Sequence, residues 1–482
     1  MTSPELGIQG DSRERNVKRV SREELLGIIH PESEVEHGEE GVEFVEWGSR
    51  AAQQVREFRT KHPGASLDAS NEPDYKHVRM GIRGAVGDLT SHAAGMDEAR
   101  VASLDAAAQS TTERVLKKKL IELSPDIHAR INQSLAEGQS PTMRLDQDSS
   151  ATEIISILSY LPSDLLADVL VRIDDINTER RPGKVEKLKV MVDSYCELAN
   201  GARDSLIPPA AKARLATLTS SVKLVVTDAL STRVRRRHRS GDTPDFAGSW
   251  LGRENRVDLM SDGTSLHTLT HELTHGLSSS RPRTVEVVSE DGQVTILPDL
   301  PTGFSEIAPQ VVDGHVTELA VQQRRWLNEA VTESVTGELF APRLEPNQNQ
   351  TLMYPAERKL FALLLTKGKL EGALPSRALG IEGSLIPESV ITEAYFEDRD
   401  PSLPLTQQRA KQKEFFHQIA ELYSPGFLNR LDAVERLLGV DVAVAIMEHP
   451  GFDPKNDGIP FLQTKEQADL YLAELRARGV IA

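Results

Sequence analysis

The sequence predicts an α+β protein that is predominantly helical. Over most of the chain, apolar residues recur at intervals of three and four, the spacing of helices that are buried on one face. Short β-branched stretches, separated by glycine, proline and serine, begin at about residue 220. The 482 residues suffice for about two to four domains. We therefore expect one domain with a small sheet, flanked by helical regions.

The composition argues against several classes of function. The chain has 56 Lys and Arg against 73 Asp and Glu, and its net charge of −17 would repel nucleic-acid phosphates. Its single cysteine, Cys196, cannot form an internal disulfide. No secretory signal is visible, and the longest apolar runs are far shorter than the roughly 20 residues that span a bilayer. We expect a cytoplasmic protein that binds neither nucleic acid nor membranes.

Four segments are expected along the chain. Residues 1–70 are acidic and poor in aromatic residues, which predicts a mobile or loosely packed leader. Residues 71–219 form a helical domain, in which Arg181-Pro182-Gly183 is expected to separate two helices. Residues 220–400 contain the sheet, and residues 401–482 form a helical C-terminal extension.

The domain at 220–400 is expected to contain two strands, a helix, a hairpin and a further helix. These elements are the strands Val222–Thr227 and Arg256–Met260, a helix from about Thr264 to Ser279, a hairpin from Thr284 to Leu297, and a helix from about Val316 to Leu339. The turn of the hairpin is indicated by Glu290-Asp291-Gly292.

The first of these helices carries the sequence His271-Glu272-Leu273-Thr274-His275. Residues four apart in a helix lie on one face, with Cβ atoms about 5–6 Å apart. Both imidazoles can therefore reach one ion at the roughly 2.0–2.1 Å that zinc–nitrogen bonds require. Glu272 can lean over the open position of the metal and take a proton from the bound water. This pattern predicts a catalytic zinc site.

A catalytic zinc ion needs a third protein ligand and a fourth position for water. His267 would lie about 12 Å from His275 along the helix axis, which is too far for one shared ion. Glu329 and Glu333 are also four residues apart. One of these carboxylates can bind the metal while the other accepts a hydrogen bond from a ligand imidazole.

Together the two motifs resemble those of the gluzincin metallopeptidases, the clan of the thermolysin-like enzymes and the neutral zinc aminopeptidases. The resemblance rests on His271–His275 and on Asn328–Glu333, which reads N-E-x-x-x-E. The run Trp326–Glu329 is close to the W-x-N-E-G-F-A signature of the aminopeptidases. The resemblance covers at most about a third of the chain.

This resemblance implies a zincin-like catalytic domain with an active-site helix. It implies one zinc ion bound by His271, His275 and Glu329, with Glu272 as the general base and Glu333 as the hydrogen-bond partner of His271. The implied activity is zinc-dependent hydrolysis of peptide bonds in a peptide or protein substrate. The alternative is a catalytically silent zincin fold that acts as an interaction or regulatory module, but the intact Glu272 favours the enzyme.

The chain departs from the family in its spacing. Between His275 and Glu329 lie 53 residues, where the family has some twenty, and an insertion at about 283–314 would account for the excess. No G-x-M-E-N stretch precedes the motif, so aminopeptidase specificity is not predicted. The sequence leaves open the oligomeric state, endo- or exopeptidase action, and whether the leader or the insertion covers the cleft.

Two further roles have candidates. The strand Arg256–Met260 is either the edge strand that aligns an extended substrate or an ordinary core strand. A tyrosine could stabilise the oxyanion, and Tyr354 is the first choice because the arrangement of a tyrosine before an apolar helix resembles the aminopeptidases. Tyr395 is the rival, and packing is the alternative role for both tyrosines.

Overall fold

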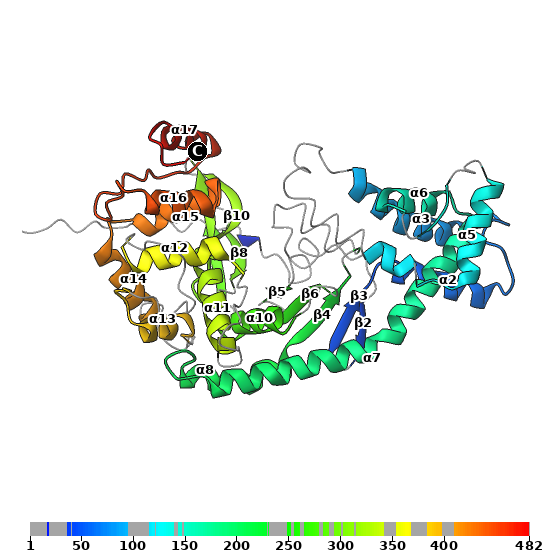
Figure 1. Cartoon of the computed structure of the whole chain (residues 1–482), viewed down its shortest axis with the longest axis horizontal. Coiled ribbons are helices and arrows are strands. Elements are labelled where there is room, and N and C mark those ends of the chain that lie inside the picture. The colour runs from blue at the N-terminus through cyan, green and yellow to red at the C-terminus, as the bar shows by residue number, and fades with distance from the viewer. Residues whose placement is uncertain are drawn as a thin grey trace, which may run out of the picture. The chain divides into compact units, whose positions relative to one another are not determined.

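The protein is an α+β chain in which helices predominate, as the sequence predicts (Figure 1). The structure is a computed structural model. It describes residues 17–18, 36–39, 41–94, 115–120, 122–138, 143–146, 149–228, 230, 248–251, 255–260, 265–278, 283–288, 294–299, 302–312, 315–341, 353–367, 383–397 and 409–481.

The chain divides into two compact units. The sheet unit comprises Glu32–Asn200 and Leu215–Gly276. The C-terminal unit comprises Met1–Pro31, Gly201–Arg214 and Leu277–Ala482. The division falls between Gly276 and Leu277, within the helix that carries His271 and His275, α10 (Leu266–Ser278), so the two units do not follow the four segments expected from the sequence.

Among the residues described for the sheet unit, five strands form one sheet in the order β2-β3-β4-β6-β5. Its strands are β2 (Glu36–Glu39), β3 (Val42–Val45), β4 (Lys223–Thr227), β5 (Gly248–Leu251) and β6 (Arg256–Met260). Neighbouring strands in the β3-β4-β6 series are parallel, whereas β2 and β5 pair antiparallel at the two ends. Parallel strands are usually covered on both faces, which explains the continuous apolar run of β4.

The expected strands at 222–227 and 256–260 are present, but β6 is not an edge strand. It lies between β4 and β5. Its two polar residues are buried as an ion pair, with Arg256 Nε 2.7 Å from Asp258 Oδ1 on the same face of the strand. Within the described part of the sheet, β5 is the end strand on this side.

The helices of the sheet unit begin before residue 70. They are α2 (Ser49–Lys61), α3 (Pro73–Ala94), α5 (Pro125–Glu137), α6 (Ala151–Tyr160) and α7 (Ser163–Gly201), and α8 (Pro209–Ser221) leads back to β4. Phe44 on β3 and Val55 on α2 are both fully buried. The expectation of a mobile or loosely packed leader therefore does not apply to residues 42–61, whose apolar side chains belong to the core.

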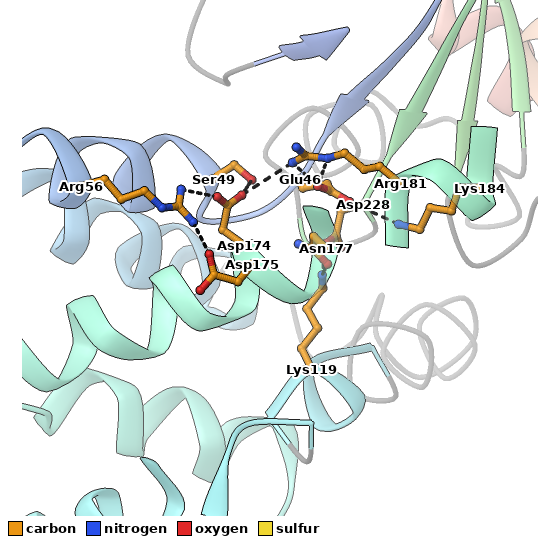
Figure 2. Close-up of polar contacts among 10 residues, drawn as sticks. All are labelled: Glu46, Ser49, Arg56, Lys119, Asp174, Asp175, Asn177, Arg181, Lys184 and Asp228. Atoms are coloured by element: carbon orange, nitrogen blue, oxygen red, sulfur yellow. Dashed lines mark hydrogen bonds and ion pairs between the residues drawn. The ribbon is translucent and has the colours of Figure 1, made fainter. Parts of the chain in front are cut away.

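The expected break at Arg181-Pro182-Gly183 does not occur, because α7 continues through Pro182 (Figure 1). A proline inside a helix removes one hydrogen bond and costs about 3 kcal/mol. Figure 2 shows what lies beside it: Arg181 and Lys184 reach from α7 to Glu46, which directly follows β3. Ion pairs with a residue far away in sequence thus hold the helix on both sides of the proline. The local pattern Arg181-Pro182-Gly183 carries no information about these distant contacts.

These ion pairs belong to a buried network at the carboxyl ends of β3 and β4 (Figure 2). The nitrogen Nη2 of Arg181 lies 2.8 Å from Glu46 Oε2 and 3.7 Å from Asp174 Oδ1. Lys119 pairs at 2.8 Å with Asp228, the residue after β4. Each buried carboxylate therefore faces a cation, which offsets the cost of removing the charges from water.

The C-terminal unit contains the remaining strands. In one sheet β8 (Val294–Asp299) pairs parallel with β1 (Val17–Lys18) and antiparallel with β7 (Arg283–Val288). The expected hairpin is confirmed by the β7–β8 pairing, while its turn signal, Glu290-Asp291-Gly292, lies outside the described residues.

The expected helix from Val316 to Leu339 is only partly correct. Residues 315–323 form β10 (His315–Gln323), which pairs antiparallel with β9 (Glu306–Val312), and α11 (Arg325–Phe340) begins after them. The sequence between the two strands is Asp313-Gly314, a strong hairpin signal. Strand pairing with residues upstream thus decides the conformation of 315–323.

Six further helices lie in the described part of the C-terminal unit. They are α12 (Pro355–Leu365), α13 (Glu388–Tyr395), α14 (Ala410–Leu422), α15 (Phe427–Leu438), α16 (Val440–Glu448) and α17 (Lys465–Ala477). Helix α12 packs against α11 and α16, and α15 packs against α16 and α17. No helix among the described residues has the length and apolar character needed to span a membrane.

Candidate metal centre

Two histidines and one glutamate bring their ligand atoms together. One nitrogen each from His271 and His275 and a carboxylate oxygen of Glu329 all lie within 4.8 Å of one another. Both histidines are buried and Glu329 is partly buried. Among the described residues, this is the group of His, Cys, Asp and Glu side chains that could hold a metal ion. The structure therefore assembles the three residues that the sequence analysis assigned to the metal.

The geometry of the two imidazoles suits a shared ion. Their Nε2 atoms are 3.1 Å apart, and the rings are nearly perpendicular at 79°. Two nitrogens bound to one tetrahedral zinc ion at about 2.05 Å would lie about 3.3 Å apart. The observed separation is close to this value. A donor set of two imidazoles and one carboxylate also matches the ligands that zinc takes in catalytic sites.

The helix that carries both histidines is α10 (Leu266–Ser278), at the position expected from the sequence. The hydroxyl of Ser265 accepts a hydrogen bond from the amide of Thr268, which caps the first turn. Leu269, Leu273 and Leu277 are at most 1% exposed and fix the rotation of the helix. This packing keeps the histidine face in a constant orientation.

The side chain of Glu272 packs against Gly248, the first residue of the end strand β5. A Cβ atom on Gly248 would stand 3.0 Å from Glu272 Oε1 and 2.9 Å from its Cγ. Glu272 is 5% exposed. The absence of a side chain at Gly248 thus leaves the space that this carboxylate occupies, a feature that sequence analysis missed because β5 has no distinctive pattern.

The C-terminal end of α10 is fastened to α11 through residues 302–305, which we call the bridge segment. The amide of Gly303 donates to the carbonyl of Ser278 at 3.2 Å, and the amide of Phe304 donates to Asn328 Oδ1 at 3.1 Å. Gln412 on α14 donates to the carbonyl of Gly303 at 2.7 Å. Part of the segment that the sequence predicts as an insertion therefore contacts Asn328, the residue before Glu329.

Glu333 is fully buried one turn after Glu329. Its Oε1 accepts a hydrogen bond of 2.7 Å from the amide of Met353. It also faces Arg358 on α12, whose pKa is lowered by burial and partly restored by the charge of Glu333. Glu333 thus connects α11 to Met353, which lies just before α12. The pairing of Glu333 with His271 stays a prediction.

The two tyrosine candidates occupy different settings. Tyr395 is fully buried, and its hydroxyl forms a hydrogen bond with the hydroxyl of Thr332. Tyr354 is partly buried and caps α12 with φ 54° and ψ 51°, a left-handed conformation that is unfavourable before Pro355. The hydrogen bond between Met353 and Glu333 holds this strained residue close to α11.

Several carboxylates lie near the beginning of α11. Burial raises the pKa of Glu357, and the charge of Glu329 raises it further. Burial also raises the pKa of Glu435 to about 7, with a smaller contribution from Asp432. Additional negative charge is therefore unfavourable in this part of the C-terminal unit.

In comparisons with known proteins, no protein-family model, no curated protein and no solved structure matches the chain.

Proposed function

We propose that this protein is a zinc-dependent hydrolase of peptide bonds with a zincin-like active site. The observation that carries the proposal is the grouping of His271, His275 and Glu329 within 4.8 Å of one another, with Glu272 beside the two histidines in sequence. A bound zinc ion would polarise the scissile carbonyl and lower the pKa of a water molecule. The carboxylate of Glu272 would take a proton from that water and deliver it to the leaving amine.

Two features of the structure support a peptide as the substrate. Within the described part of the sheet, β5 has a neighbour on one side, β6, and an extended peptide could pair with its other side. Because Gly248 on this strand lies against Glu272, a peptide aligned on β5 would pass close to the proposed base. This assigns to β5 the role that the sequence analysis considered for Arg256–Met260.

Tyr354 is the better candidate for stabilising the oxyanion. The hydroxyl of Tyr395 is occupied by its hydrogen bond with Thr332 in a fully buried position. The strained backbone of Tyr354 is the kind of outlier that clusters at functional sites. Replacement by phenylalanine would test the role, since it removes the hydroxyl alone.

The first test measures metal content and hydrolysis on four proteins: the wild type, His271→Ala, Glu272→Gln and His267→Ala. His267 lies on the same helix, one turn before His271, and is the matched control. We expect one zinc per wild-type chain by mass spectrometry of the metal, loss of zinc in His271→Ala, and full zinc in the other two variants. With a quenched-fluorescent peptide library, Glu272→Gln should lose at least about 100-fold in rate, and His267→Ala should not.

Two outcomes would overturn the proposal. If His271→Ala keeps its zinc, the assignment of His271 to the metal site is wrong. If Glu272→Gln still hydrolyses peptides at the wild-type rate, the role of Glu272 as the base is wrong. A wild-type protein that holds zinc yet cleaves no peptide, with or without a chelator, would instead favour the silent interaction module.

A further inference from the structure

The helix that carries Glu329 lacks a cap of its own. Its N-cap residue, Arg324, has φ 57° and ψ 31°, and no side chain of the helix caps the first turn. The guanidinium of Arg324 instead lies over the ring of Phe416, 4.3 Å from its centroid. The amide groups at the start of a helix need acceptors from elsewhere.

An acceptor comes from α15, more than 100 residues later in the chain. Asp432 Oδ2 accepts the amide of Arg324 at 3.2 Å, and Oδ1 accepts the indole Nε1 of Trp326 at 2.9 Å. A carboxylate at this end of a helix is also favoured by the helix dipole. One side chain thus holds both the backbone amide of the N-cap residue and the first large apolar side chain of the helix.

The position of Trp326 bears directly on the metal ligand. Trp326 is 1% exposed, and Glu329 follows it by three residues, so the two side chains are neighbours on the helix surface. A rotation or shift of the first turn of α11 would move both side chains together. The bridge segment fixes Asn328 in the same turn, but from another direction.

We propose that Asp432 is a positioning residue for the metal site: by holding Arg324 and Trp326 it sets the direction in which Glu329 presents its carboxylate. The inference rests on the proposed function, because it assigns Glu329 to a metal ion. It makes the C-terminal helices part of the catalytic machinery, whereas the sequence suggested a separate extension.

The test compares Asp432→Asn with Asp457→Asn in the full-length protein. Asp457 is the matched control because it is also a poorly exposed aspartate bonded to α15, with its Oδ2 3.0 Å from Arg430 Nη2. Both variants should lose thermal stability. Only Asp432→Asn should weaken zinc affinity, by about 10- to 100-fold in competition with a chelating dye, the range seen for partners of metal ligands.

Two further readouts separate positioning from general stability. Cobalt substituted for zinc should show a changed visible spectrum in Asp432→Asn and the wild-type spectrum in Asp457→Asn. In the metal-free protein, amides of residues 325–329 should exchange hydrogen faster in Asp432→Asn alone. Trp326→Phe, which removes the indole donor and keeps a ring, should weaken zinc binding less than Asp432→Asn does.

The outcomes distinguish this inference from the proposed function. If the wild type binds no zinc, the proposed function fails and the role of Asp432 fails with it. If the wild type binds zinc through His271 but Asp432→Asn has the wild-type affinity and cobalt spectrum, only the role of Asp432 is overturned. Equal losses of affinity in the two aspartate variants would also overturn it.

Discussion

Replacing Gly303 with alanine should destabilise the C-terminal unit strongly, because three separate features of the structure oppose a side chain there. The backbone has φ 48°, in the left-handed region. A Cβ atom would stand 2.3 Å from Tyr395 Cε2 and 2.5 Å from Asn328 Oδ1, and real contacts of a Cβ atom are longer than 3.0 Å. Both neighbours are buried and hydrogen-bonded, so neither can move without breaking a further contact.

The size of the effect follows from these contributions. The left-handed conformation costs alanine about 1 kcal/mol. Overpacking against Tyr395 and Asn328 adds about 1–3 kcal/mol. Strain in the hydrogen bonds that Gly303 makes to Ser278 and Gln412 adds about 1 kcal/mol. The expected loss is about 3–5 kcal/mol in the free energy of unfolding, or roughly 6–20 °C in Tm for a unit of this size.

The assay is thermal and urea unfolding of the full-length protein, with Gly458→Ala as the control. Gly458 has φ 66° in the same unit, but a Cβ atom there would meet nothing within 4 Å. Its replacement should therefore cost only the conformational part, about 1 kcal/mol. Equal destabilisation by the two variants would refute the packing argument for the bridge segment.

Three other perturbations test separate parts of the structure. Gly248→Ala should retain zinc but lose about 100-fold in peptide hydrolysis, the effect of a shift of about 1 Å in a reacting group, because the new methyl group displaces Glu272; full activity with bound zinc would contradict this. Arg181→Met should cost about 1.5–3 kcal/mol in urea unfolding, since it removes the charged hydrogen bonds to Glu46 and leaves that buried carboxylate with Lys184 as its remaining cation; a loss under about 1 kcal/mol would argue against the network. For Glu435, the pKa is raised from 4.5 to about 7 in the folded chain, chiefly by burial, so folding loses stability as the pH rises from about 4.5 to about 7. Glu435→Gln should flatten that dependence and add about 3 kcal/mol above pH 7; an unchanged pH profile of the urea midpoint would show that this carboxyl is not the cause.

The sequence alone was sufficient to locate the helix that carries His271 and His275 and to name the three residues that the structure groups as a possible metal site. His271 and His275 are fixed relative to each other by one turn of helix, a local geometry that any helix supplies. The apolar spacing of Leu269 and Leu273 then shows that this helix is buried. Information within a few residues was therefore enough for this half of the site.

Elements that depend on distant partners could not be predicted in the same way. Residues 315–323 form a strand because they pair with β9, although their composition also fits a helix. Helix α7 passes Pro182 because Glu46, far away in sequence, holds Arg181. The order of β5 and β6 in the sheet likewise depends on chain connections that carry no local signal.

The spacing of 53 residues between His275 and Glu329 illustrates why sequence distance is a weak criterion for a metal site. A shared ion would require that the ligand atoms of His271, His275 and Glu329 lie close together, as they do in this structure. The bridge segment connects Ser278, three residues after His275, to Asn328, the residue before Glu329. Ser278 and Asn328 are each within three residues of a candidate metal ligand, whereas most of the expected insertion lies farther away along the chain. Substitutions in the bridge segment should therefore affect the site more than changes of loop length elsewhere between the two motifs.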